Sequence, residues 1–128
     1  MPISSPAVGF TNTRDAAPTL QANGTATAPT AGTTIATFAA APTAGNWELV
    51  TAVVIGTAVA IADANNVGAY VNGAQKAAVP VTPTVLVTSA QMPMVFALNA
   101  GDVVTLRAIA NATATSVYNV TGTLRQIS

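Results

Sequence analysis

Acidic side chains are the residues of this sequence that could carry catalytic chemistry, and beyond residue 32 there are three of them: Glu48, Asp63 and Asp102. General acid–base catalysis needs a titratable group held in place, and two carboxylates at a suitable separation can hydrolyse a glycoside. Spacing alone does not exclude such a pair. Two of the three acids fall at expected strand ends or turns, where surface roles are far commoner. We therefore expect no enzyme activity, and a hydrolase dependent on Glu48 is the enzymatic alternative.

Histidine and cysteine are absent from all 128 residues. Their absence excludes disulfides, zinc sites made of cysteine and histidine, thiol nucleophiles and every histidine-dependent triad. The nine glycines are scattered, and no Gly-Lys-Ser or Gly-Lys-Thr sequence marks a phosphate-binding loop. We therefore expect no cofactor and no metal.

Charge is scarce, because four acids and four bases make up 6% of the chain and give a formal net charge of zero. Soluble domains average about a quarter charged residues. Without a basic patch the chain has no electrostatic footprint for nucleic acid or for an anionic membrane. A surface with so little charge favours being covered, either by oligomerisation or by incorporation into a larger assembly.

Membrane insertion and secretion are also not expected. The most apolar run, residues 49–62, has 14 residues between Glu48 and Asp63, whereas a spanning helix needs about 20. Later uncharged stretches are broken by Pro80, Pro83 and Pro93. The first residues, Met-Pro-Ile-Ser-Ser-Pro, contain no basic group and lead into no apolar core. We therefore expect synthesis in the cytoplasm without a signal peptide.

Residues 1–32 are interpreted as an extended N-terminal arm. They contain four of the eight prolines and no sustained period of 2 or 3.6, and proline fixes φ and removes a backbone donor. A disordered tail is the alternative. Isolated apolar residues instead favour an arm that becomes ordered on a partner. The expected partner-binding residues of this arm are Val8, Phe10, Arg14 and Leu20.

Residues 33–128 are interpreted as one β domain, because valine, isoleucine and threonine are enriched and turn residues recur at short intervals. Alanine-rich pieces at 36–41 and 108–114 favour helix and are the main counter-argument. Many short strands at this spacing predict an all-β fold, an antiparallel jelly-roll sandwich that follows the extended arm. The expected strands are 33–40, 47–57, 66–72, 74–79, 83–90, 93–98, 102–110 and 116–127, with a further short strand at 58–62.

Two turns are specific. Asn72-Gly73 stands between two apolar runs, and a type I′ hairpin turn needs positive φ at both central positions. Residues 98–103 predict a longer turn, in which Gly101 takes the left-handed position and Asp102 accepts hydrogen bonds from nearby backbone N–H groups. Both turns are folding signals.

The strand that begins at Trp47 is apolar on both faces. A strand of a free two-layer sandwich alternates with polar residues, so we expect one face in the core and the other against a second subunit. An outer face that is merely rich in alanine and threonine is the alternative. One face carries Trp47, Leu49, Val53 and Ile55, and the other carries Val50, Ala52 and Val54.

Four segments carry a family resemblance: residues 45–49 (Gly-Asn-Trp-Glu-Leu), 68–73 (Gly-Ala-Tyr-Val-Asn-Gly), 98–106 (Leu-Asn-Ala-Gly-Asp-Val-Val-Thr-Leu) and 120–124 (Val-Thr-Gly-Thr-Leu). In this order they resemble the tumour-necrosis-factor-like jelly-roll family, which includes the globular heads of complement and collagen-like proteins. Val120 stands where that family usually has phenylalanine.

The resemblance implies ten strands in two sheets and a tight three-fold trimer with an aromatic and aliphatic axis. Some members of the family bind calcium near the axis, but no ligand set carries over to this sequence. The trimer-interface residues that the resemblance suggests are Trp47, Leu49, Tyr70, Phe96 and Tyr118.

Small domains of this composition are common among tailed-phage virion proteins, and a proline-rich arm before a trimeric jelly roll resembles a capsid decoration (cement) protein. We expect a homotrimer on the capsid surface that binds the major capsid protein through its arm and the base of its domain, without nucleic acid or membrane partners. The alternative is a receptor-binding knob of a head or tail fibre, in which residues 111–116 contact a glycan. A knob normally follows a long shaft, which residues 1–32 do not supply.

Overall fold

The protein is described by a computed structural model over residues 17–56, 63, 65–79 and 87–128. Its regular elements are β-strands, a conformation that its many valine, isoleucine and threonine residues favour. The strands are β1 (Thr19–Thr27), β2 (Thr34–Thr37), β3 (Gly45–Gly56), β4 (Val67–Val71), β5 (Ala74–Val79), β6 (Val87–Leu98), β7 (Val104–Ala108) and β8 (Val117–Gln126).

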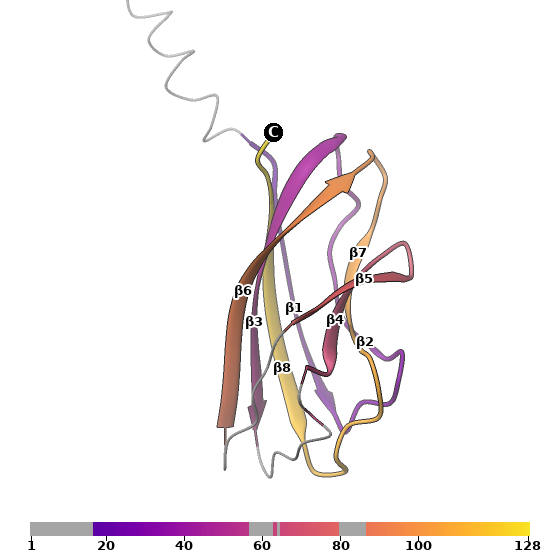
Figure 1. Ribbon diagram of the computed structural model, residues 1–128, viewed down its shortest axis with the longest axis vertical. Helices are drawn as coiled ribbons and strands as arrows, with labels where there is room; N and C mark the ends of the chain where they lie inside the picture. Colours follow the sequence, from indigo (N-terminus) through magenta and orange to yellow (C-terminus); the bar gives the residue numbers. More distant parts are fainter. Residues whose placement is uncertain (1–16, 57–62, 64, 80–86) are drawn as a thin grey trace, which may run out of the picture.

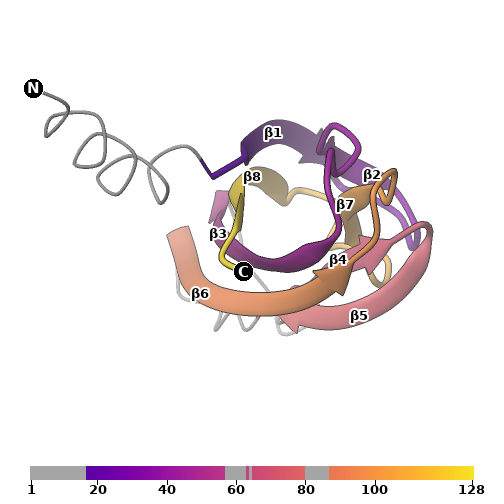
Figure 2. The same cartoon turned by 90° about the horizontal axis from the view of Figure 1, so that it is seen from above.

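The strands pair as a long hairpin that has been rolled up. β1 pairs with β8, β2 with β7, β3 with β6 and β4 with β5, all antiparallel. Two further pairings, β3 with β8 and β4 with β7, roll this hairpin into two sheets. The orders are β1-β8-β3-β6 and β2-β7-β4-β5, and the sheets form two layers (Figures 1 and 2). The predicted all-β jelly-roll sandwich is therefore confirmed.

Several strands differ from the expectation in extent. β6 is one strand of 12 residues where two were expected, and it contains Pro93. Proline is tolerated there because β6 is an edge strand. The alanine-rich pieces shorten their strands, so that β2 ends at Thr37 and β7 at Ala108. The expected strand at 58–62 lies outside the described residues, which contain eight strands where the resemblance implied ten.

The arm expected over residues 1–32 is too long, because β1 pairs with β8 along its whole length. Its outward positions are polar and exposed, while its inward positions are half-buried. Among the inward residues Leu20 packs against the core, so it is part of the sandwich and not of an arm. Val8, Phe10 and Arg14 lie outside the described residues. Three of the four inward residues of β1 are alanine or glycine, which hides the alternation from a hydrophobic pattern.

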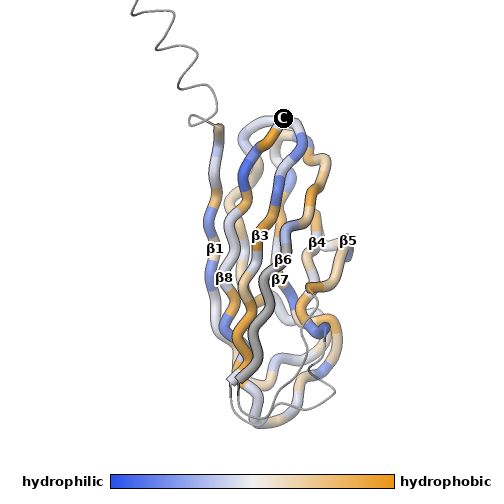
Figure 3. The backbone as a smooth tube through the Cα atoms, turned by 60° about the vertical axis from the view of Figure 1, so that its left-hand side comes forward, coloured by the Kyte–Doolittle hydropathy of each residue, from blue (hydrophilic) through white to orange (hydrophobic). Residues whose placement is uncertain are grey.

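The core lies between the two sheets and is fully closed around β3. Trp47, Leu49, Val53 and Ile55 have no exposed surface, and Figure 3 shows the contrast between apolar β3 and the more polar β1. Gly122 on β8 leaves room for the ring of Phe38, since a Cβ at Gly122 would lie 2.6 Å from the Phe38 Cζ atom. The Phe38 ring thus requires a residue without a side chain at position 122 of the facing strand β8.

Thr51 is the exception in this core. It is fully buried on β3, and among the described residues its Oγ1 atom has no hydrogen-bond partner. Burying an unpaired hydroxyl costs free energy. We expect Thr51→Val to raise the free energy of unfolding by about 1–2 kcal/mol, as measured by urea denaturation.

The matched control for this substitution is Thr105→Val. Thr105 is also buried, but its Oγ1 accepts a hydrogen bond of 2.9 Å from the Arg107 Nε–H. Removing that acceptor should lower stability. Equal losses in the two variants would show that the Thr51 hydroxyl is satisfied.

Candidate interaction surface

On the outer face of the β1-β8-β3-β6 sheet, β3 is apolar from Val50 to Val54. Val50 and Ala52 are half-buried there, and Val54 is 37% exposed. On the neighbouring strand Val95 is 57% exposed, and it stands opposite Glu48 on the same face. Val54 and Val95 are two of the three large hydrophobic side chains that the described residues expose.

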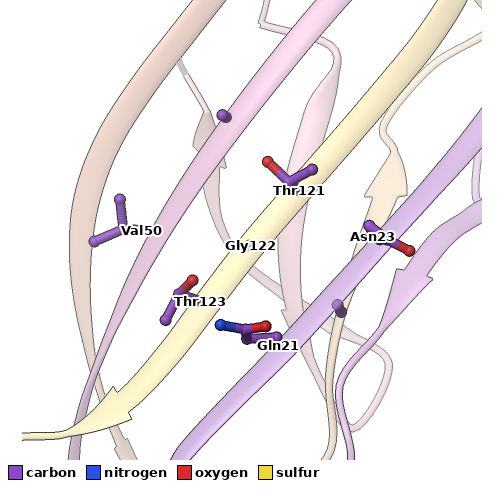
Figure 4. A pocket seen from close by; sticks show the side chains of 8 residues that line it. Gln21, Asn23, Val50, Thr121, Gly122 and Thr123 are labelled. Atoms are coloured by element: carbon purple, nitrogen blue, oxygen red, sulfur yellow. The ribbon is translucent and has the colours of Figure 1, made fainter.

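The β1–β8 half of the same face is polar but uncharged at its centre. Gln21 stands opposite Thr123, and Asn23 stands opposite Thr121. With Val50 and Ala52 these four side chains line a shallow hollow of about 370 Å³ (Figure 4). Because no titratable group lines it, the hollow offers hydrogen bonds and van der Waals contact but no acid–base chemistry.

Charge on this face is confined to one end. Glu48 on β3 stands opposite Arg125 on β8, and Arg125 in turn stands opposite Thr19 at the start of β1. On its other side Glu48 stands opposite Val95 on β6. Covering the centre of the face with another surface therefore costs little desolvation free energy.

Asp63 lies in a buried polar cluster at one end of the sandwich. Its carboxylate accepts hydrogen bonds from Ser116 Oγ (2.7 Å), from the Tyr118 hydroxyl (2.6 Å) and from the backbone N–H of Thr113 (3.1 Å). The amide of Asn66 donates to the Tyr118 oxygen at 3.0 Å. Burial, and then the hydrogen bond to Asp63, raise the pKa of Tyr118 above its ordinary value of 10.0. The cluster fixes the segment before β8.

Asp102 has a different role, in the turn between β6 and β7. It accepts hydrogen bonds from the Asn99 N–H (2.8 Å) and the Asn72 side-chain amide (2.9 Å). These two bonds, in that order of importance, hold its pKa below the ordinary value of 3.8.

Asn72, Gly73 and Gly101 all have positive φ, so both expected turns are confirmed. The three described acids thus lie in three different elements: Glu48 on β3, Asp63 in the buried polar cluster and Asp102 in the turn between β6 and β7.

Three of the five expected trimer-interface residues lie in the core of the single chain. Trp47, Leu49 and Tyr118 have no exposed surface, so their side chains have nothing left to offer a second subunit, and that expectation is wrong for them. The alternation of β3 turns the opposite face outward. Tyr70 and Phe96 are half-buried and stay predictions; the Arg107 guanidinium lies 5.2 Å from the centre of the Tyr70 ring.

A second hollow, which the sequence did not predict, separates β5 from β6. It has a volume of about 750 Å³, and we call it the β5–β6 groove. The described residues that line it are Val71, Asn72, Lys76, Ala77, Met94, Val95, Phe96, Ala97, Asn99 and Asp102. Its floor could have been suspected from Met94 and Phe96, whose spacing places them on the inner face of an edge strand.

Within the described part of the chain no group of three or more acidic, histidine or cysteine side chains could hold a metal ion. The same residues contain no helix long and apolar enough to cross a membrane.

No family model matches the sequence, and no curated protein matches it. Among solved structures, 35 chains match. One of them is a family 35 carbohydrate-binding module from Clostridium thermocellum, with 19% sequence identity and a TM-score of 0.43, over 85% of this chain and 92% of that chain. At that similarity the match carries no statement about the function of this chain.

Proposed function

We propose that this chain is a structural virion protein, a homotrimeric capsid decoration protein that binds the head lattice through residues 1–16 and the base of its jelly-roll domain. The observation that carries the proposal is the outer face of the β1-β8-β3-β6 sheet, which has no charge at its centre and exposes Val54 and Val95. Exposed apolar area of this kind is typical of surfaces that another protein covers. The jelly-roll topology supports the likeness to trimeric heads of the tumour-necrosis-factor-like family.

The work of such a protein is binding. Apolar surface removed from water contributes about 25 cal/mol per Å², and this gain must exceed the entropy lost on association. A face without charges at its centre adds little opposing desolvation. Of the three described acids, Asp63 and Asp102 accept structural hydrogen bonds and Glu48 lies on a strand face, which favours this assembly role over the hydrolase alternative.

The self-association part of the proposal is tested with Val54→Lys/Val95→Lys. We expect the unaltered chain to have three times the mass of one chain by light scattering, and the double variant to be monomeric, because two ammonium groups would have to be desolvated in the interface. Gln75→Lys/Ala78→Lys on β5 is the control, since these residues are exposed but lie on the other sheet. A double variant that keeps the trimeric mass would overturn the proposed interface.

The decoration role is tested by the copy number of the chain in purified particles of its source, measured by quantitative mass spectrometry against the major shell protein. We expect hundreds of copies in a fixed ratio to that protein. A handful of copies would instead favour a fibre tip, and absence from the particles would contradict a virion role.

A further inference from the structure

The two long sides of the sandwich differ in how closely the sheets approach. On the β1–β2 side the backbones are so close that a Cβ atom at Gly24 would overlap the carbonyl oxygen of Ile35. On the opposite side the sheets leave the β5–β6 groove, with a volume of about 750 Å³. Figure 2, which views the sandwich from above, shows β5 and β6 together on that side. For the residues that the structure describes, the fold is therefore closed along one side and open along the other.

The groove combines an apolar floor with two strand edges that no other described strand pairs with. Met94 and Phe96 pack against the core but stay half-buried, so part of each side chain faces the groove. Among the described strands β6 pairs only with β3 and β5 only with β4. An edge strand presents backbone N–H and C=O groups that an extended peptide can pair with, while alternate side chains of the peptide enter adjacent pockets. The geometry suits an added strand with apolar residues at every second position.

The chain itself contains such a segment before β1. In Val8-Gly9-Phe10 the two apolar side chains would lie on one face of an extended strand, with no side chain between them on the other. Further along, Arg14 and Asp15 supply one charge of each sign, and the groove holds one of each in Lys76 and Asp102.

The register of the sheet shows where this segment leaves the domain. Thr19, the first residue of β1, is level with Arg125, Glu48 and finally Val95, which lines the groove. The segment therefore departs at the height of the groove but from the opposite edge of the same sheet. The eight residues between Phe10 and Thr19 can span about 26 Å when extended. When two copies lie edge to edge, the segment of one copy reaches the groove of the next directly.

We propose that the β5–β6 groove binds the Val8–Phe10 region of a neighbouring copy as a strand added to β6, with the two apolar side chains over Met94 and Phe96. The contact is heterologous, so repetition around an axis closes a ring. The inference rests on the proposed function, in which several copies assemble. Within the segment proposed to bind the head lattice, it assigns residues 8–10 to a neighbouring copy instead.

The test uses disulfide trapping in the full chain, which contains no cysteine of its own. Chains carrying Phe10→Cys are mixed with chains carrying Ala77→Cys under mild oxidation, and covalent dimers are counted on a non-reducing gel. We expect them to form about tenfold faster than in the controls, because binding raises the effective concentration of the two thiols. In one control Gln75→Cys, exposed on the same strand outside the groove, replaces Ala77→Cys; in the other Thr11→Cys, on the opposite face of the segment, replaces Phe10→Cys.

Equal rates in all three mixtures would overturn the proposal. The occupant is identified with a chain that carries both Phe10→Cys and Ala77→Cys. Cross-links between chains support a second copy, whereas a disulfide formed only within one chain overturns that assignment in favour of the chain's own segment. A high copy number on particles without preferential trapping would leave the decoration role standing and refute the binding of residues 8–10 in the groove. Preferential trapping in a chain that is absent from particles would support binding in the groove and refute the decoration role.

Discussion

Asp63→Ala is expected to lower the free energy of unfolding by about 4 kcal/mol, because hydrogen bonds to a charged group contribute roughly 1.5–3 kcal/mol each and are not fully additive. The buried carboxylate of Asp63 accepts from two hydroxyls, Ser116 and Tyr118, and from one backbone N–H. Alanine would leave these donors without that acceptor, and the Ser116 and Tyr118 side chains have no exposed surface. A loss of this size is a large part of the stability of a domain, and urea denaturation measures it.

Two milder substitutions show whether the carboxylate itself matters. Asp63→Asn keeps one acceptor oxygen and should cost less than Asp63→Ala. Asp102→Asn alters a half-buried turn residue outside this cluster and should cost least. An Asp63→Ala protein as stable as Asp102→Asn would mean that the cluster contributes nothing to the fold.

The same cluster predicts the behaviour in alkali. Because the pKa of Tyr118 is raised above 10.0 in the folded state, its neutral form is the one that the fold favours. Its contribution is fully present below the pKa of an unfolded tyrosine and is lost as the pH rises above it. Stability should therefore fall above about pH 10, and the fall should be shallower in Tyr118→Phe, which has no proton to lose at that position.

Gly24→Ala should lower the free energy of unfolding by about 3 kcal/mol, at the upper end of what overpacking usually costs. The added Cβ meets the backbone of Ile35 on β2, and a backbone atom cannot turn aside as a flexible side chain can. β1 would have to move away from β2, which opens the closed side of the sandwich. Hydrogen exchange of the β1 amides should accelerate more than that of β3.

Gly56→Ala is the matched control, with the same change on β3. Among the described residues nothing lies within 4 Å of a Cβ built at Gly56. Alanine restricts the unfolded chain more than glycine does, so this variant should be neutral or slightly more stable. Similar losses at both glycines would show that backbone entropy, not the β1–β2 approach, sets the cost at Gly24.

Local signals in the sequence were sufficient for the turns and for most strands. Asn72-Gly73 needs positive φ at both positions whatever surrounds it, and both residues have it. The β5 strand begins and ends where the pattern predicted, at Ala74 and Val79. β1 was missed because its inward residues after Leu20 are Ala22, Gly24 and Ala26, which give little hydrophobic contrast although the alternation with polar residues is regular.

The interaction surface was half predictable. The sequence showed that the strand from Trp47 is apolar on both faces, and one face does lie in the core while Val54 on the other is exposed. The sequence did not show which of the two faces lies in the core and which lies on the outside. The bulkiest residues, Trp47 and Leu49, were assigned to a subunit interface, but they fill the space between the sheets, where large side chains remove most apolar area from water.

Composition and local pattern thus determined the exclusion of cysteine- and histidine-dependent chemistry, the β character and the tight turns, because each of these depends on residue types or on neighbours in the chain. The tertiary structure decided the rest. Which side of a strand is buried, where two edge strands leave a groove, and that Thr19 lies level with Val95 depend on pairings between residues far apart in sequence. Such pairings are fixed when the hairpin rolls into two sheets, and no single segment encodes them.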